Sequence, residues 1–173
     1  SNEYAGFISL GGYLFDIHNG RSDSILAAIT AHEVGHQWWY GAVGNDQVRQ
    51  PWLDESLAMY SELRYYEWYY PDLVDWWWQA RVDRWDPVGP VDVTIYDYAD
   101  SETFVHNMYG RSAYFIRDLR TQMGPAAFTT FLQEYYRQYK YRIATAADFR
   151  RLAQSQTTTD LTPLFESYFQ EVP

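Results

Sequence analysis

The segment HEVGH at residues 32–36 places two histidines one helical turn apart, with Glu33 next to the first of them. Side chains four residues apart lie on the same face of an α-helix, so His32 and His36 can reach one metal ion. A catalytic zinc ion usually takes a third protein ligand and keeps its last position for water. Glu55, after 18 intervening residues, is the candidate. The fold must therefore bring the start of a second element to this helix.

These side chains predict metal-assisted hydrolysis of a peptide-like bond. Zinc acidifies a bound water and polarises a carbonyl group. Glu33 is the candidate general base, which takes a proton from the water and passes it to the leaving amine. The alternative is an amphipathic helix with two surface histidines. The apolar neighbours Val34, Trp38 and Trp39 argue against that alternative, because they do not suit a solvated helix.

Length and composition exclude several classes of function. The chain has 173 residues, which suits one domain, and it has no cysteine, which excludes disulfides and thiolate metal sites. Its net charge of −10 argues against binding to nucleic acid or to an anionic membrane, and it suits peptides with a free amino terminus. No apolar stretch is long enough to be a membrane span.

Aromatic residues make up 20% of the chain and cluster shortly after Glu55, at residues 65–66, 68–70 and 76–78. Three consecutive tryptophans on a helix point in three directions, so residues 76–78 cannot all enter one core. Two interpretations stay open. Some of these side chains cover the domain loosely, or they pack against a neighbouring domain that this chain does not include.

Helical patterns dominate the rest of the chain. Residues 6–15 are predicted to form a strand or a strand pair with a turn or a bulge at Gly11-Gly12, and Asp23 or Ser24 caps a helix that runs to about residue 41. The next helix begins after Pro51, so Glu55 is expected in its first turn. Further helices are expected at 72–85, 109–123, 125–139, 146–155 and 161–170, with an irregular loop at 86–103.

Two motifs resemble those of the gluzincin metallopeptidases of the aminopeptidase N and leukotriene hydrolase family. Residues 32–38, HEVGHQW, resemble the family's HExxHxW, and residues 52–58, WLDESLA, resemble its WLNEGxA segment. Asp54 and Ser56 replace the usual Asn and Gly. The resemblance implies one zinc ion per chain, held by His32, His36 and Glu55, with Glu33 as the base.

Two further segments extend the resemblance. Residues 109–113, YGRSA, resemble the family's YxKGA, which implies that Tyr109 donates a hydrogen bond to the oxyanion of the tetrahedral intermediate. Arg111 and Ser112 depart from the usual Lys and Gly. Residues 2–7, NEYAGF, resemble the end of the family's GxMEN motif, which implies that Glu3 binds the free α-amino group of the substrate. The alternative for Glu3 is a frayed terminal residue.

Glu62 and His106 are secondary candidates. Glu62 follows Glu55 by two helical turns, on the same face, and can orient a zinc-bound histidine, although a solvated position is the equal alternative. His106 lies near Tyr109 and can contribute to substrate binding, although a lone histidine is more often structural.

The resemblance spans nearly the whole chain and implies a mainly α, thermolysin-like catalytic core, with a short β segment followed by a helical bundle. Residues 1–173 are then a single truncated catalytic domain without its upstream β-rich domain. The expected activity is that of a zinc aminopeptidase. An endopeptidase, an epoxide-hydrolase-like relative, or a metal-binding fragment that is inactive without its missing domain are the alternatives. The sequence leaves the compartment open, and only the resemblance of residues 36–41 to bacterial members of the family points toward an extracytoplasmic enzyme.

Overall fold

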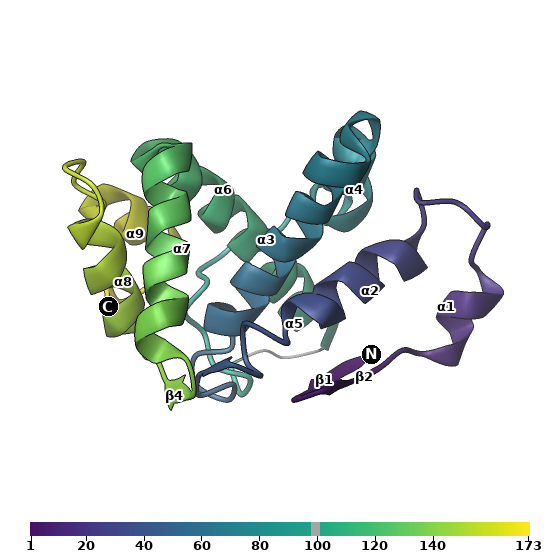
Figure 1. Ribbon diagram of the computed structural model, residues 1–173, viewed down its shortest axis with the longest axis horizontal. Coiled ribbons are helices and arrows are strands. Elements are labelled where there is room, and N and C mark those ends of the chain that lie inside the picture. The colour runs from purple at the N-terminus through teal and green to yellow at the C-terminus, as the bar shows by residue number, and fades with distance from the viewer. Residues whose placement is uncertain (98–100) are drawn as a thin grey trace.

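The structure is a computed structural model that describes residues 1–97 and 101–173, and helices dominate it (Figure 1). The prediction of a mainly helical chain with a short β segment near its N-terminus is confirmed. The elements in chain order are β1 (Asn2–Tyr4), β2 (Phe7–Ser9), α1 (Gly12–Asp16), α2 (Ile25–Gly35), β3 (Val43–Gly44), α3 (Trp52–Tyr69), η1 (Pro71–Leu73), α4 (Val74–Arg81), η2 (Asp83–Trp85), α5 (Ser101–Val105), the π-helix η3 (His106–Arg111), α6 (Ser112–Met123), α7 (Pro125–Tyr139), β4 (Arg142–Ile143), α8 (Ala146–Ser155) and α9 (Thr162–Tyr168).

The N-terminal hairpin pairs β1 with β2 in antiparallel register, Asn2 opposite Ser9 and Tyr4 opposite Phe7. The sequence prediction of strand over 6–15 is wrong in its second half, because residues 12–16 form the short helix α1. Leu14 is fully buried there while its neighbours are exposed. A single buried residue in a short apolar run fits either a strand or a helix, so periodicity alone could not distinguish them.

Helix α2 begins as expected but ends early. Ser24 is its N-cap, and its hydroxyl accepts a hydrogen bond from the Ala27 amide at 3.3 Å. The helix ends at Gly35 rather than at residue 40 or 41, with His36 as its C-cap residue. After His36 the chain makes a series of turns and reverses direction at Tyr40. Tyr40 takes a φ of 116°, and its amide donates to Val43 O at 2.8 Å. His36 therefore lies at the last turn of α2.

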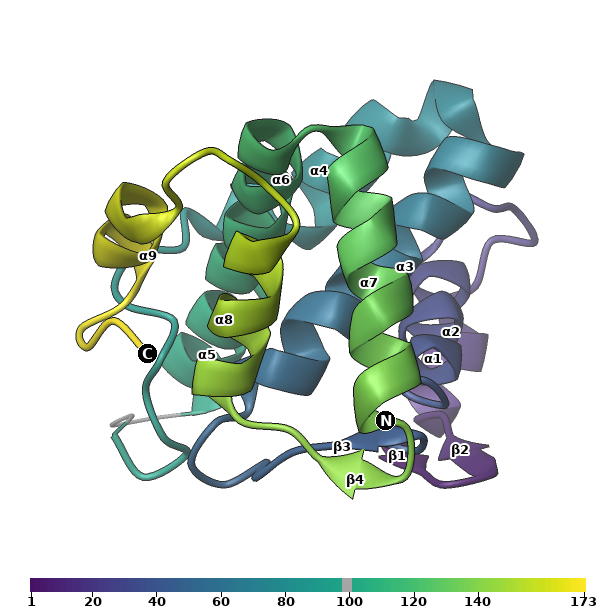
Figure 2. The same cartoon turned by 60° about the vertical axis from the view of Figure 1, so that its left-hand side comes forward.

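Helices α2 and α3 lie side by side, and Gly35 permits their close approach (Figures 1 and 2). A Cβ atom on Gly35 would lie 2.9 Å from Ser61 Cβ on α3, which is closer than two carbon atoms can pack. The lack of a side chain at this position therefore sets the distance between the two helices that carry the candidate metal ligands.

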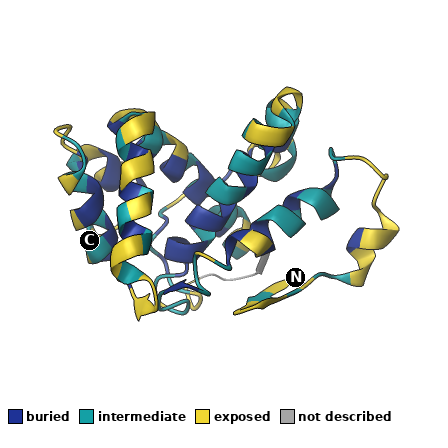
Figure 3. Ribbon diagram, viewed as in Figure 1, coloured by how far each residue is buried: buried dark blue, intermediate teal, exposed yellow. Residues whose placement is uncertain are grey.

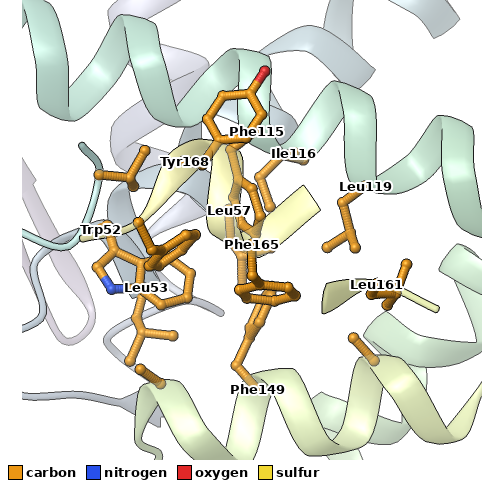
Figure 4. Close-up of a cluster of buried hydrophobic side chains, with 14 of the residues drawn as sticks. Trp52, Leu53, Leu57, Phe115, Ile116, Leu119, Phe149, Leu161, Phe165 and Tyr168 are labelled. Atoms are coloured by element: carbon orange, nitrogen blue, oxygen red, sulfur yellow. The ribbon is translucent and has the colours of Figure 1, made fainter. Parts of the chain in front are cut away.

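The main core fills the space between the first turns of α3 and the C-terminal helices α6, α8 and α9 (Figure 4). Trp52, at the start of α3, packs edge-on against Phe149 at 5.3 Å and against Phe169 at 4.8 Å between ring centroids. Figure 3 shows that the first half of α3 is buried, whereas the hairpin and the outer face of α7 are exposed. The core thus anchors the turn of α3 that contains Glu55.

Trp52→Ala is expected to lower the free energy of unfolding by about 3–5 kcal/mol, the usual cost of removing a large buried aromatic side chain. Trp52 is 1% exposed. Urea unfolding measures the change. Trp68, which is 68% exposed, is the control, and Trp68→Ala should cost less than about 1 kcal/mol. Equal costs for the two variants would contradict the assignment of this core.

The other boundaries differ modestly from the prediction. The helix expected at 72–85 consists of α4, residues 74–81, with one 3₁₀ turn on each side. The expected loop at 86–103 ends sooner, because α5 begins at Ser101, and residues 98–100 of that loop lie outside the described residues. Among the described helices, none combines the length and the apolar character needed to cross a membrane.

Candidate metal centre

The three predicted ligands come together from two helices. His32 lies in the last turn of α2, His36 at its C-cap, and Glu55 in the first turn of α3. The two Nε2 atoms are 3.1 Å apart, and Glu55 Oε2 lies 3.0 Å from His32 Nε2 and 3.5 Å from His36 Nε2. The three ligand atoms thus converge on one point, all within 4.8 Å of one another.

The charge balance of this triad suits a cation. Burial alone would lower the pKa of His32, but the carboxylates of Glu55 and Glu62 outweigh it and raise that pKa to about 10. Burial would raise the pKa of Glu55, but hydrogen bonds to His32 and His36 lower it to about 2. Two imidazole nitrogens that face each other beside a carboxylate, away from water, are a donor set that zinc prefers. The residues present therefore fit a zinc ion.

Glu62 lies directly behind His32. Its carboxylate is fully buried, which excludes the solvated position left open by the sequence. Glu62 Oε2 lies 3.5 Å from His32 Nδ1, at the outer limit of a hydrogen bond, while Oε1 accepts hydrogen bonds from the Trp77 indole at 2.7 Å and from the Arg81 guanidinium at 2.5 Å. Burial would raise the pKa of Glu62, but Arg81 and His32 lower it, so the carboxylate stays charged.

Glu33 extends from α2 beside the triad, and its Oε2 is buried without a hydrogen-bond partner among the described residues. Burial raises the pKa of Glu33, and the charges of Glu3 and Glu55 raise it further, against the opposing effect of His32 and His36. An unsatisfied carboxylate oxygen with a raised pKa is suited to accept a proton from a nearby water.

Tyr109 reaches the centre from the π-helix η3. Its hydroxyl donates to Glu55 Oε1 at 3.1 Å, and its ring lies 5.4 Å from that of His32. Burial, then Glu55, raise the pKa of Tyr109 well above its ordinary value, so the phenol keeps its proton. A π-turn is a frequent feature of functional sites, and here it places Tyr109 toward α2 and α3. The sequence pattern predicted an ordinary α-helix from residue 109 and no π-turn.

Glu3, on β1, is near enough to this centre for its charge to raise the pKa of Glu33 and of Tyr109. Its Oε1 accepts a hydrogen bond from Gln47 Nε2 at 2.8 Å, and the same nitrogen donates to Asp54 Oδ2 at 2.8 Å. Sequence reasoning missed Gln47. The signal available was the presence of three separate amide residues, Asn45, Gln47 and Gln50, in the polar loop before Trp52, which alone does not distinguish a site from a solvated loop.

Asp54 lies behind His36. Its Oδ2 is 3.9 Å from His36 Nδ1, and its Oδ1 accepts a hydrogen bond from Asn45 Nδ2 at 2.8 Å. Burial, then the charge of Glu55, raise the pKa of Asp54 to about 7. Two amide donors, from Asn45 and Gln47, oppose this rise and stabilise the ionised carboxylate.

A cavity of about 200 Å³ adjoins His32, Glu33 and Tyr109. His106 contributes to its wall, stacked on Trp85 with ring centroids 4.3 Å apart. A larger groove of about 640 Å³ lies along the opposite face of α2, where aromatic side chains line it, among them Trp38, Trp39, Tyr65 and Trp68. The candidate metal ligands do not line that groove, so the smaller cavity is the candidate substrate site.

Comparisons with known proteins identify a family. The family described as "Peptidase family M1 domain" matches residues 12–168. The chain is 24% identical over 157 residues to aminopeptidase N of Lactobacillus helveticus, which covers 85% of this chain and 19% of that protein. It is 27% identical over 138 residues to glutamyl aminopeptidase of Sus scrofa, covering 72% of this chain and 14% of that protein.

Solved structures share the fold. An M1 zinc metallopeptidase from Deinococcus radiodurans matches with a TM-score of 0.64 and 24% identity, over 85% of this chain and 34% of that one. A two-domain M1 zinc metallopeptidase bound to L-arginine matches with a TM-score of 0.66 and 24% identity, over 87% of this chain and 34% of that one. The chain therefore spans about a fifth of its curated relatives and about a third of these solved chains.

Proposed function

The chain belongs to peptidase family M1, and from that membership we propose that it is the zinc-binding catalytic part of an aminopeptidase. The observation that carries the proposal is the convergence of His32, His36 and Glu55 on one buried point. Curated relatives named as aminopeptidases support the substrate class, peptides with a free amino terminus. We further propose that residues 1–173 form a single catalytic domain of the thermolysin-like type.

Each polar side chain at the centre has a role in the proposed reaction. Zinc, held by His32, His36 and Glu55, would supply a more acidic water and a polarised scissile carbonyl. Glu33 takes the proton of the attacking water and passes it to the leaving amine. Glu62 Oε2, 3.5 Å from His32 Nδ1, orients that imidazole through its charge and is placed to accept the Nδ1 proton when the ring turns toward the metal.

Tyr109 and Glu3 act on the substrate itself. The Tyr109 phenol keeps its proton and donates it in a hydrogen bond to the developing oxyanion. The Glu3 carboxylate pairs with the substrate's ammonium group and sets the distance from the amino terminus to the scissile bond.

The proposal is tested with one short peptide in two forms, with a free and with an acetylated amino terminus. The zinc-loaded protein in its natural full length is expected to cleave the free form and to leave the acetylated form intact, because acetylation removes the charge that Glu3 binds. Removal of zinc with a chelator should abolish the cleavage, and readdition should restore it. Equal cleavage of both forms would instead indicate an endopeptidase.

The 173-residue chain is tested in parallel with the same peptides. Its inactivity with zinc bound, beside an active full-length protein, would identify it as a metal-binding fragment that needs further domains. Hydrolysis of an epoxide substrate without peptide cleavage by the full-length protein would favour the epoxide-hydrolase-like alternative.

Tyr109→Phe is expected to lower kcat by about 10²–10³-fold, the usual loss on removal of one oxyanion donor, and to leave zinc content unchanged. Steady-state kinetics and metal analysis measure the two effects. Tyr96→Phe is a matched control, because the Tyr96 side chain is exposed, and it should leave kcat unchanged. An unaltered kcat in Tyr109→Phe would remove the phenol from the mechanism.

The aromatic groove on the opposite face of α2 supports a second proposal, that this face packs against another domain of the whole protein. Of the three consecutive tryptophans, Trp77 enters the core. The exposed tryptophans of the groove are Trp38 and Trp68. Exposed apolar surface of this extent marks interaction sites in soluble proteins. The fluorescence of these tryptophans is expected to be quenched by acrylamide in the 173-residue chain and protected in the full-length protein.

A further inference from the structure

The Gln47 side chain connects the N-terminal hairpin to the first turn of α3. Its Nε2 donates to Glu3 Oε1 on β1 and to Asp54 Oδ2 on α3, each at 2.8 Å. A primary amide nitrogen has two hydrogens, so both bonds are compatible with one side chain. Asn45 Nδ2 donates to the other oxygen of Asp54 at 2.8 Å, and this bond fixes the orientation of the carboxylate that accepts from Gln47. Gln47 therefore ties the position of the Glu3 carboxylate to the helix that contains Glu55.

The hairpin needs such a connection because its side chains are largely exposed. Tyr4 is 51% exposed and Phe7 is 62% exposed. A second glutamine, Gln37, holds the hairpin backbone: its Nε2 donates to Tyr4 O at 3.1 Å, and its Oε1 accepts from the Gly6 amide at 2.8 Å. Gln37 thus fixes where the strand lies, and Gln47 fixes where the Glu3 carboxylate points.

A neutral amide suits this position better than a charged group. Lysine or arginine at position 47 would pair with Glu3 and compete with a substrate ammonium for the carboxylate, whereas an acid would repel both Glu3 and Asp54. The Gln47 amide orients Glu3 without cancelling its charge. It engages Oε1 of Glu3, and the second oxygen has its own lone pairs for an incoming ammonium group.

We propose that Gln47 is a positioning residue for specificity, which holds the Glu3 carboxylate in place to receive the free amino terminus of a peptide substrate. The inference rests on the proposed aminopeptidase function and extends it to a residue outside the motifs. A carboxylate held in its binding orientation loses less conformational freedom when the ligand arrives, so the interaction strengthens. Gln47 is expected to affect the choice between free and blocked amino termini and to have no effect on zinc.

The test measures binding rather than turnover. The full-length, zinc-loaded protein with the substitution Glu33→Gln, which stops turnover, is titrated calorimetrically with one tripeptide in its free and acetylated forms. Gln47→Met, which keeps the side-chain length but removes the amide, is expected to lower the ratio of the two affinities about tenfold. Zinc content and melting temperature are measured for each variant. Zinc content should stay close to that of the parent, whereas the melting temperature of Gln47→Met should fall modestly, because the buried Asp54 carboxylate loses one of its two amide donors.

Gln50→Met is the matched control. Gln50 lies in the same loop, but its Oε1 accepts a hydrogen bond from the Ala146 amide at 3.0 Å, away from Glu3. This variant is expected to leave the affinity ratio unchanged. A fall in the ratio as large as that of Gln47→Met would show that loop disturbance is the cause and would overturn the inference.

A double substitution shows whether Gln47 acts through Glu3. In a Glu3→Gln background, Gln47→Met should cause no further change in the affinity ratio, because the carboxylate that it positions is already gone. An equal tenfold fall in that background would assign Gln47 a direct role and overturn the positioning role.

Failure of this inference is distinguishable from failure of the proposed function. If the parent prefers the free tripeptide and Gln47→Met keeps that preference, the inference alone fails. If the parent binds both forms equally, then the aminopeptidase assignment and the inference fail together.

Discussion

Glu33→Gln is expected to lower kcat for a free peptide by about 10³–10⁴-fold, at the upper end of what a general base contributes. The amide has nearly the shape of the carboxylate but cannot accept the proton of the attacking water. In the structure, Glu33 Oε2 is buried with no hydrogen-bond partner among the described residues, so the substitution breaks no hydrogen bond at that oxygen. Zinc content should be unchanged, because the three converging ligand atoms belong to other residues.

Steady-state kinetics on the full-length protein and metal analysis of the same samples provide the measurement. Glu166→Gln is the matched control, since Glu166 is exposed on α9 and remote from the triad, and its kcat should equal that of the parent. A Glu33→Gln variant with parental kcat would exclude the proposed base and with it this mechanism of hydrolysis.

Glu55→Ala is expected to weaken zinc binding by about 10²–10³-fold, roughly the share of one ligand in the binding free energy of a protein zinc site. The loss follows from the geometry, because Glu55 Oε2 lies 3.0 Å from His32 Nε2 and contributes the one carboxylate of the triad. The substitution also removes the acceptor of the Tyr109 hydroxyl. Turnover should fall with zinc occupancy and recover in part at high zinc concentration.

Competition with a chromogenic chelator measures the affinity. Glu67→Ala is the control on the same helix, because Glu67 pairs with Arg120 at 2.8 Å and does not belong to the triad. Its zinc affinity should match that of the parent. If Glu55→Ala bound zinc as tightly as the parent, the third ligand would have to come from another residue.

The local features of the fold followed from the sequence because neighbouring residues determine them. Ser24 caps α2, Pro125 begins α7, and Glu55 lies in the first turn of α3, each as expected. A cap or a first turn depends on backbone groups within about four residues, so the sequence pattern is sufficient. The predicted end of α2 was wrong because its position depends on the turn at Tyr40, whose amide donates to Val43 O in strand β3, where Val43 is buried.

By itself, the sequence determined the pair His32 and His36 on one helix face and the place of Glu55 in the first turn of the next helix, because both are local properties. The contact between Glu55 and the histidines depends on the packing of α2 against α3. Only the tertiary structure decided which surroundings these ligands have. It buried Glu62 behind His32, and it placed Gln47 against Glu3, 44 residues away along the chain. Such contacts depend on how α2, α3 and the hairpin pack together, and helical periodicity contains no information about that packing.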